Sequence, residues 1–486
     1  MVPGLIESHA HLMGIGNAKK VLDLSDTRSY EELVARVAAA VKQAAPGDWI
    51  LGRGWHQSRW DPPPQPMVLG FQTHHALSAV SPENPVYLVH ASGHAAIANA
   101  RAMAIAGITR DTPSPEGGEI IKDPQGEPTG VLNETAQALV GRHVPSSENE
   151  GDRRSLELAI EECISHGITS FHDAGAGQNT IDLYREFADA GQLKIRLYVM
   201  LAGQDTRLLE SWYGRGPLIG YGDGHLTVRA IKLYADGALG SRGAWLLAPY
   251  SDRAGHVGNS IMPMSYIRGV AEQALEHGFQ LCTHAIGDRA NREVLDQYEA
   301  AFAAMGAVGR DSRFRIEHAQ HISAADIPRF GRLGVIAAMQ AIHMSSDRPW
   351  AIDRLGRQRI EEGAYVWRKL LDSGAIIANG TDAPVEPINP IECFYAAVTR
   401  KTLRGEPPGG YEADQRMTRQ EALRSYTLDA AYAAFEEQSK GSIEVGKLAD
   451  FTVLSQDILS VPEERILQTK VQRTIVGGRV VYEAGG

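Results

Sequence analysis

Residues 279–305 read FQLCTHAIGDRANREVLDQYEAAFAAM, and the two patterns in this stretch decide the fold. The apolar run Phe279–His284 is typical of a buried strand, whereas Asn291–Met305 carries apolar residues at spacings of three and four, as an amphipathic helix does. A strand that leads directly into a helix is the repeating unit of parallel α/β sheets. The stretch therefore predicts a strand–helix unit whose strand ends on a histidine.

The same alternation continues in both directions along the chain. Further helices are expected at Tyr30–Ala44, Arg153–His166, Ile181–Ala190 and Met264–His277. Seven other apolar runs are candidate strands: Val2–Glu7, Gly167–His172, Lys194–Leu201, Val228–Tyr234, Phe314–His318, Val335–Met339 and Ile376–Asn379. Eight parallel strands that alternate with helices close a (β/α)8 barrel of the TIM type, and this α/β fold is the one we expect.

Two regions interrupt the alternation. Residues 49–150 contain Pro- and Gly-rich stretches such as DPPPQP and TPSPEGGE, which we interpret as an insertion, a lid over the barrel mouth. Within residues 439–486, KVQRTIVGGRVVYE is typical of a β-hairpin with its turn at Gly477-Gly478, and it predicts a small β-sandwich segment. The barrel would then comprise residues 1–48, with the first strand and a helix, and residues 151–438.

Composition excludes several classes of protein. The 486 residues carry a net charge of −11, which argues against nucleic acid or an anionic membrane surface as the partner. No apolar run approaches the roughly 20 residues that cross a bilayer, and MVPGLIESHAHL lacks the layout of a signal peptide. Only three widely spaced cysteines are present, so no disulfide framework is expected. We therefore expect a cytoplasmic protein whose partner is neither nucleic acid nor a membrane.

Titratable residues gather where the predicted strands end. His9 and His11 in ESHAH lie two apart, so on a strand both imidazoles would point to the same side. A single H-x-H is a weak signal, because surface or core histidines also produce it. Four further residues, however, end or follow other strands: Lys232, His284, His318 and Asp382. In a barrel these positions share the rim where catalytic residues lie, and a shared metal ion would explain a lysine and an aspartate there.

The order H-x-H, Lys, His, His, Asp resembles that of the amidohydrolase superfamily. The segments PGLIESHAHL, ASGHAAIANARAMAIAGI, IKLYADGALGSR, THAIGDRANREVLDQYE, RIEHAQHI and NGTDAPVEPINP are similar to its N-substituted formamide deformylase (YtcJ-like, amidohydrolase 3) branch. The resemblance covers essentially the whole chain. Such proteins usually have a longer segment before the first barrel strand. Either the sandwich is therefore reduced, or the sequence starts downstream of the natural start. In the second case an unpaired sheet edge could be exposed and pair with another chain, for example in a homodimer.

The resemblance implies a site with two divalent metal ions. His9 and His11 would bind one ion, with Asp382 near it, and His284 and His318 would bind the other. In that arrangement a metal-activated hydroxide attacks a polarised carbonyl, and Asp382 is the natural proton shuttle.

Lys232 would bridge the two ions as an N-carboxylated lysine formed with CO2. Imidazole and carboxylate ligands suit Zn best, with Mn, Fe or Co as alternatives. His321, three residues beyond His318, and His343 compete for a ligand role, and we favour His318.

Substrate contacts are less specific, and the candidates are His94, Trp55, Arg242 and His321. His94 could polarise a carbonyl or contact a leaving group, but it could equally be a hydrogen-bonded loop histidine. The expected activity is hydrolysis of a carbon–nitrogen bond in a small N-acyl or N-formyl compound. Two alternatives are a deaminase or cyclic amide or ester hydrolase on the same barrel, which Lys232 disfavours, and a non-catalytic regulatory protein, which the complete ligand set disfavours.

Overall fold

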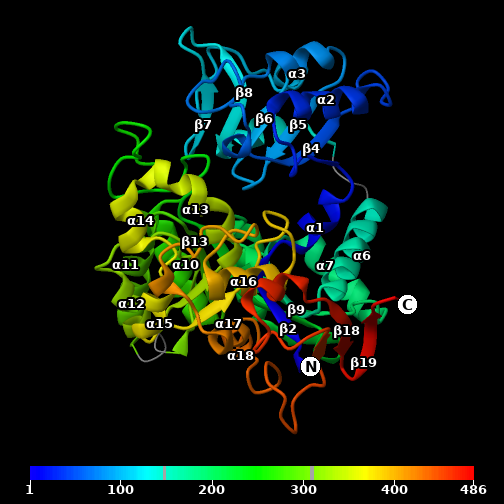
Figure 1. The fold of residues 1–486 in the computed structure, drawn as a ribbon, viewed down its shortest axis with the longest axis vertical. Helices are drawn as coiled ribbons and strands as arrows, with labels where there is room; N and C mark the ends of the chain where they lie inside the picture. Colours follow the sequence, from blue (N-terminus) through cyan, green and yellow to red (C-terminus); the bar gives the residue numbers. More distant parts are fainter. Residues whose placement is uncertain (146–148, 307–310, 486) are drawn as a thin grey trace. The chain divides into compact units, whose positions relative to one another are not determined.

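The structure is a computed structural model that describes residues 1–145, 149–306 and 311–485 (Figure 1). The chain divides into two compact units. The first comprises Met1–Leu12, Leu156–Ala235 and Met262–Gly486, and the second comprises Met13–Ser155 and Asp236–Ile261. Within the described ranges, no helix is both long and apolar enough to span a membrane.

The first unit contains the expected barrel. Its eight parallel strands are neighbours in chain order: β2 (Leu5–Ala10), β9 (Ile168–Ala176), β10 (Arg196–Ala202), β12 (Leu226–Tyr234), β13 (Gln280–Ala285), β14 (Arg315–His318), β15 (Ile336–Met339) and β16 (Ile377–Asn379). A short strand, β11 (Leu218–Gly220), pairs antiparallel with β12. The predicted barrel is confirmed, and so are the predicted strand positions apart from the start of the first strand.

The seam between the last strand and the first is joined by a loop rather than by a strand ladder. Asp382 donates its backbone N–H to the carbonyl of His9, and His11 donates to the carbonyl of Ala383, each over 2.8 Å. The Ser8 hydroxyl also donates to the Asn379 carbonyl over 2.6 Å. The loop after β16 thereby nearly closes the barrel.

Helices connect the barrel strands. They are α6 (Asn149–Ser165), α7 (Gln178–Asp189), α8 (Thr206–Arg215), α10 (Met264–His277), α11 (Asp288–Met305), α12 (Ile327–Leu333), α13 (Ala341–Leu355), α14 (Arg357–Gly363), α15 (Trp367–Asp372), α16 (Pro390–Thr399), α17 (Arg419–Ser425) and α18 (Leu428–Ala433). The apolar spacing of α11 buries Val294, Leu295 and Tyr298 on one side of that helix. The helices predicted in α6, α7, α10 and α11 are confirmed, with small differences at their ends.

The predicted first strand, Val2–Glu7, is wrong in its first half. Val2–Pro3 forms β1, which pairs antiparallel with β17 (Phe451–Leu454) in a separate sheet ordered β1-β17-β18-β19. Gly4 separates β1 from β2, and a Cβ atom there would lie 2.2 Å from Oγ1 of Thr169. β17 therefore has a neighbouring strand on each side.

The C-terminal hairpin is confirmed. β18 (Val471–Val476) and β19 (Arg479–Glu483) pair antiparallel, and they are red in Figure 1. Gly477 and Gly478 link them with φ values of 57° and 76°. Positive φ at both central residues is what a tight hairpin turn requires, and glycine adopts it without strain.

The second unit is built on its own six-stranded sheet, ordered β3-β4-β5-β6-β8-β7. The strands are β3 (Leu22–Asp23), β4 (Ile50–Trp55), β5 (Val86–His90), β6 (Ala95–Ala98), β7 (Gly118–Lys122) and β8 (Pro128–Glu134). Its helices are α1 (Leu12–Ala18), which begins at the boundary, α2 (Tyr30–Val41), α3 (His75–Val80), α4 (Ala100–Ile105) and α5 (Ala138–Gly141).

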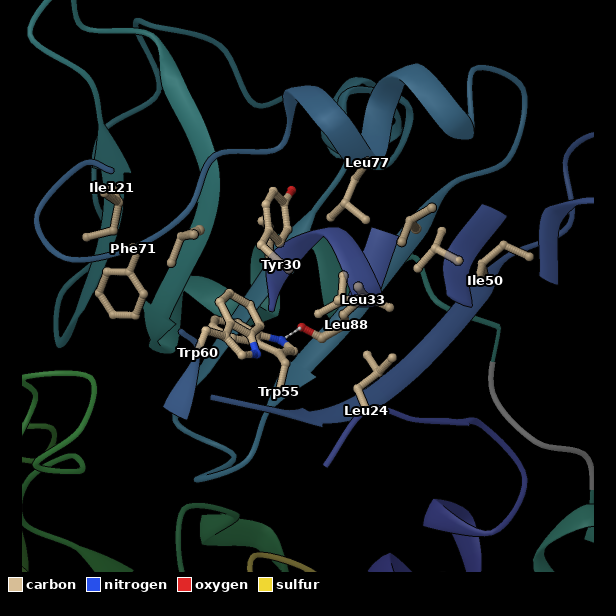
Figure 2. Close-up of a cluster of buried hydrophobic side chains, with 14 residues drawn as sticks. Leu24, Tyr30, Leu33, Ile50, Trp55, Trp60, Phe71, Leu77, Leu88 and Ile121 are labelled. Atoms are coloured by element: carbon tan, nitrogen blue, oxygen red, sulfur yellow. Dashed lines mark hydrogen bonds between the residues drawn. The ribbon is translucent and has the colours of Figure 1, made fainter. Parts of the chain in front are cut away.

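An aromatic core holds this unit together, as Figure 2 shows. The rings of Trp55 and Trp60 stack with their centroids 6.1 Å apart. Tyr30 and Leu33 of α2 belong to the same cluster, so the helix expected in the segment 1–48 packs in this unit. Residues 146–148, near the expected end of the insertion, lie outside the described residues.

Candidate metal centre

Asp382 lies at the centre of a cluster of imidazoles at the C-terminal ends of the barrel strands. Its Oδ1 atom is 3.2 Å from Nε2 of His11 and 3.6 Å from Nε2 of His9. Its Oδ2 atom is 3.9 Å from Nε2 of His343 and 4.0 Å from Nδ1 of His318. Two three-residue groups of metal-ligating type therefore share this carboxylate, His9/His11/Asp382 and His318/His343/Asp382.

The loop that carries Asp382 is fixed against β2. Glu7, which is fully buried, accepts hydrogen bonds from the backbone N–H and the hydroxyl of Thr381. A Cβ atom on Gly380 would lie 2.3 Å from Oε1 of Glu7, so the loop approaches the strand closely. Burial raises the pKa of Glu7 to about 8. Glu7 thus links the strand of His9 to the loop of Asp382.

Two members of the cluster have unusual backbone conformations. His318 has a φ of 77° and Asp382 a φ of 60°. A residue other than glycine pays of the order of 1–3 kcal/mol for such a conformation, and strain of this kind is common at functional sites. The surrounding hydrogen bonds, including that from the Asp382 N–H to the His9 carbonyl, maintain it here.

Lys232 and His284 approach the cluster from the neighbouring strands β12 and β13. The imidazole rings of His284 and His318 are 4.5 Å apart between centroids. Nζ of Lys232 lies 4.3 Å from the centroid of the Tyr234 ring, and the side chain is buried. After burial, the charge of Lys232 is among the influences that lower the pKa of His9 and of His318. All six residues expected from sequence at the barrel rim therefore gather at one end of the barrel.

Burial fixes the charge states of the cluster. It lowers the pKa of His9 to about 4 and the pKa of His318 well below its usual range, so both rings are neutral at pH 7. Burial alone would raise the pKa of Asp382, but the nearby imidazoles, that of His11 above all, hold it well below its ordinary value. Neutral imidazoles around an ionised carboxylate are the ligand forms that a divalent cation requires.

The orientation of His318 follows from its partner Gln340. The amide nitrogen of Gln340 donates to the Ala338 carbonyl, so its Oε1 atom faces Nδ1 of His318 at 2.7 Å. Because that oxygen can only accept, the Nδ1–H of His318 donates to it, which leaves Nε2 unprotonated. In this tautomer Nε2 is the ring nitrogen that is available to a metal.

Several atoms of the cluster lack a hydrogen-bond partner in the described part of the chain. They are Nε2 of His9, Nε2 of His343 and Oδ1 of Asp382, all buried. Leaving a buried polar group unsatisfied costs about 1–3 kcal/mol each. A divalent cation would satisfy Nε2 of His9 and Oδ1 of Asp382 together, so these residues fit a metal.

The structure also locates the competitors for the ligand role. His343 lies in the first turn of α13 and reaches Asp382, although its helix position gave no strand-end signal in the sequence. His321 is buried, but its ring packs against Tyr365 at 5.4 Å between centroids. His318 rather than His321 therefore faces Asp382.

Three substrate-side candidates lie in the second unit. Trp55 is fully buried in the core of that unit and donates its indole N–H to the Leu88 carbonyl (Figure 2). Its side chain is therefore not exposed to a substrate. Arg242 pairs with Asp252 over 2.8 Å. Nδ1 of His94 lies 2.7 Å from Oε2 of Glu134.

Comparisons with known proteins agree with this geometry. A model of the amidohydrolase family matches residues 1–482. The chain is 32% identical to the putative amidohydrolase YtcJ of Bacillus subtilis (strain 168), over 99% of this chain and 89% of that protein. It is 30% identical to the N-substituted formamide deformylase of Arthrobacter pascens, over 100% of this chain and 89% of that one. The solved structure of an uncharacterized metal-dependent hydrolase from Pyrococcus horikoshii OT3 matches with a TM-score of 0.73 at 27% identity, covering 95% of this chain and 87% of that chain.

Proposed function

Since the chain belongs to the amidohydrolase family and is an enzyme of that family, we propose that it cleaves the carbon–nitrogen bond of small N-acyl or N-formyl compounds at the cluster around Asp382. The observation that carries the proposal is the carboxylate of Asp382, whose Oδ1 atom faces the imidazoles of His9 and His11 and whose Oδ2 atom faces those of His318 and His343. The name of the Arthrobacter relative, a formamide deformylase, supports the choice of substrate class.

The proposed metal ligands are the six barrel-rim residues. His9, His11 and Asp382 would hold one divalent ion, and His284 and His318 would hold a second. Their nitrogen and oxygen donors suit Zn best, while Mn, Fe and Co accept the same donors. When bound, the metal supplies Lewis-acid chemistry, which makes hydroxide available near neutral pH and polarises a carbonyl.

After reaction with CO2, Lys232 would provide a ligand to both proposed metal ions. The neutral amine forms a bond to the carbon of CO2 and releases one proton, which leaves an N-carboxylate with two oxygen donors. The burial of Lys232 at the end of β12, next to the strand of His284, supports this assignment. The modification also replaces the positive charge that opposes metal binding at His9 and His318.

Asp382 is the proposed proton shuttle. Its carboxylate stays ionised, so it can accept a proton from the attacking water and return it to the leaving amine. The loop hydrogen bonds of Thr381 with Glu7 hold it in place for both transfers. Gln340 keeps the His318 ring from turning.

Two further residues are proposed as substrate contacts. His94 is oriented by Glu134, which adopts φ 51° and ψ −126°, a strained conformation for a residue other than glycine. His321 remains a candidate because neither of its buried ring nitrogens has a hydrogen-bond partner within the described ranges. Burial lowers the pKa of His321 to about 3, so its ring is neutral and can both donate and accept.

We also propose that the protein works in the cytoplasm. Its three cysteines, Cys163, Cys282 and Cys393, are all buried and unpaired, which fits a reducing compartment. A homodimer stays a prediction.

Removal of His284 or His343 distinguishes two ligand sets for the second ion. We expect His284→Ala to bind one equivalent of metal fewer than the wild type, whereas His343→Ala should keep the full complement. Metal content after gel filtration without chelator measures this, with His225→Ala as the control because His225 bonds the Ile195 carbonyl instead. The reverse result would transfer the ligand role from His284 to His343, which lies 3.9 Å from Asp382.

A substrate panel tests the proposed activity. The purified enzyme, supplied with Zn or Mn, should release amine from N-formyl or N-acyl amines, measured by an amine-specific assay alongside N-acyl amino acids and esters. Ammonia released from amino-substituted rings would favour a deaminase, and ester or cyclic amide turnover alone would favour those hydrolases. Less than one equivalent of bound metal, with no turnover, would favour a non-catalytic regulatory protein.

A further inference from the structure

Glu317 and Arg315 form a buried ion pair on β14, immediately before His318. Nε of Arg315 donates to Oε1 of Glu317 over 2.7 Å, and Nη2 donates to Oε2 over 2.8 Å. Both side chains have an exposed fraction of 0%. Paired N–H···O bonds between a guanidinium and a carboxylate are among the strongest that proteins form. They hold Glu317 as an ionised acceptor.

The same carboxylate contacts His9. Its Oε2 atom is the partner of Nδ1 of the His9 ring. Because an ionised carboxylate can only accept, the hydrogen lies on Nδ1, and the neutral ring is left with an unprotonated Nε2. That Nε2 atom lies 3.6 Å from Oδ1 of Asp382. The contact therefore selects the tautomer of His9 that can bind a metal at the cluster.

Arg315 is fixed by other strands of the barrel. Its Nη2 atom donates to the carbonyl of Ser8, over 2.6 Å, in the strand that carries His9. Its Nη1 atom lies 3.1 Å from Nδ1 of His172 on β9. The position of Glu317 relative to His9 is thus set by three strands at once.

Fold stability alone does not explain an ion pair in this place. Burial removes both charges from water, and replacing such a pair with apolar side chains of similar volume is often neutral or stabilising. Removing only one partner, by contrast, leaves a buried charge and destabilises the protein. A role for the pair in the metal centre would explain why the chain keeps two buried charges despite the free-energy cost of removing them from water.

We propose that Glu317 is a positioning residue that fixes the tautomer and ring orientation of His9 for metal binding, and that Arg315 holds Glu317 for this purpose. The inference rests on the proposed metal centre. Partners of this kind, which bond the far nitrogen of a metal-binding histidine, typically contribute 10–100-fold in metal affinity.

Glu317→Gln is the first test. Arg315 would donate to the single carbonyl oxygen of the new amide, so the NH2 group would face His9. Because this group can only donate, it would favour the tautomer of His9 with an unprotonated Nδ1 and a protonated Nε2. We expect the affinity for Zn, measured by competition with a chromophoric chelator, to fall about 10–100-fold. The melting temperature of the metal-free protein is measured in parallel, because the readout must separate metal binding from folding.

A double variant keeps the test decisive if the single variant folds poorly. Arg315→Met with Glu317→Leu removes both charges, so we expect the metal-free protein to melt at or above the wild-type temperature. Its Zn affinity should still fall by the same factor. Asp450→Asn is the matched control, since it breaks a buried ion pair with Arg196 (2.7 Å) at the opposite end of β10 and should leave Zn affinity unchanged.

The outcomes separate cleanly. Wild-type Zn affinity in the double variant, or an equal loss in Asp450→Asn, would overturn the role of Glu317 while the proposed function stood. A wild-type protein that binds no transition metal would overturn the proposed function and this inference together.

Discussion

Asp382→Asn should lower kcat/KM by about 10²–10⁴-fold while leaving bound metal in place, because a general acid–base residue contributes a factor of this size. Asparagine has nearly the same shape, and its amide oxygen can still face His9 and His11. It cannot take up a proton at the pH of the reaction. The measurement is steady-state kinetics on the amide that the panel identifies, together with metal content of the same preparation.

Asp326→Asn is the matched control for this substitution. Asp326 is also buried and pairs with Arg292 (2.8 Å) and Arg329 (3.1 Å), but it is not part of the cluster around Asp382. It should lose stability without a comparable loss of kcat/KM. Near-wild-type activity in Asp382→Asn would remove Asp382 from the shuttle role.

Lys232→Ala should lose one equivalent of metal and at least about 10²-fold in kcat/KM. The physical reason is the lost N-carboxylate: the second ion loses a shared ligand, and each 1.4 kcal/mol of lost transition-state stabilisation is tenfold in rate. The smaller side chain leaves space beside Tyr234, so added formate, acetate or propionate should restore part of the activity. Metal content and kinetics with and without added carboxylate measure this.

Lys232→Met is the control, because its side chain fills the space that a soluble carboxylate would need. It should be as inactive as Lys232→Ala and should not respond to added carboxylate. In the wild type, labelled bicarbonate should give a carbamate carbon signal by NMR. Full activity and full metal content in Lys232→Met would show that no bridging carboxylate is needed.

The barrel could be predicted from sequence because its strands and helices have different apolar periods, as in Phe279–His284 and Asn291–Met305. The start of the first strand could not, because Val2–Pro3 and Leu5–Ala10 are continuous in apolar pattern although they pair in different sheets. The boundaries of the second unit could not be predicted from the sequence either. Pro- and Gly-rich composition marks loops, but it does not indicate which helix packs on which sheet.

The same contrast applies to the candidate site. His9, His11 and Asp382 were found because strand ends converge at one rim of a barrel, a property of the fold. His343 was harder to place because it reaches the cluster from a helix, where no alternation marks its direction. For Trp55 the sequence does not separate a contact from a core residue, because an aromatic side chain in a Pro-rich region is compatible with both. In the structure it is buried, and its indole N–H donates to the Leu88 carbonyl.

The loop that joins the last barrel strand to the first has a consequence for biosynthesis. Ser8 and Asn379, which bond across this seam, are separated by 371 residues. During translation Ser8, His9 and His11 therefore leave the ribosome long before Asn379 and Asp382 are made. The residues grouped around Asp382 can therefore come together only after most of the chain has been synthesised.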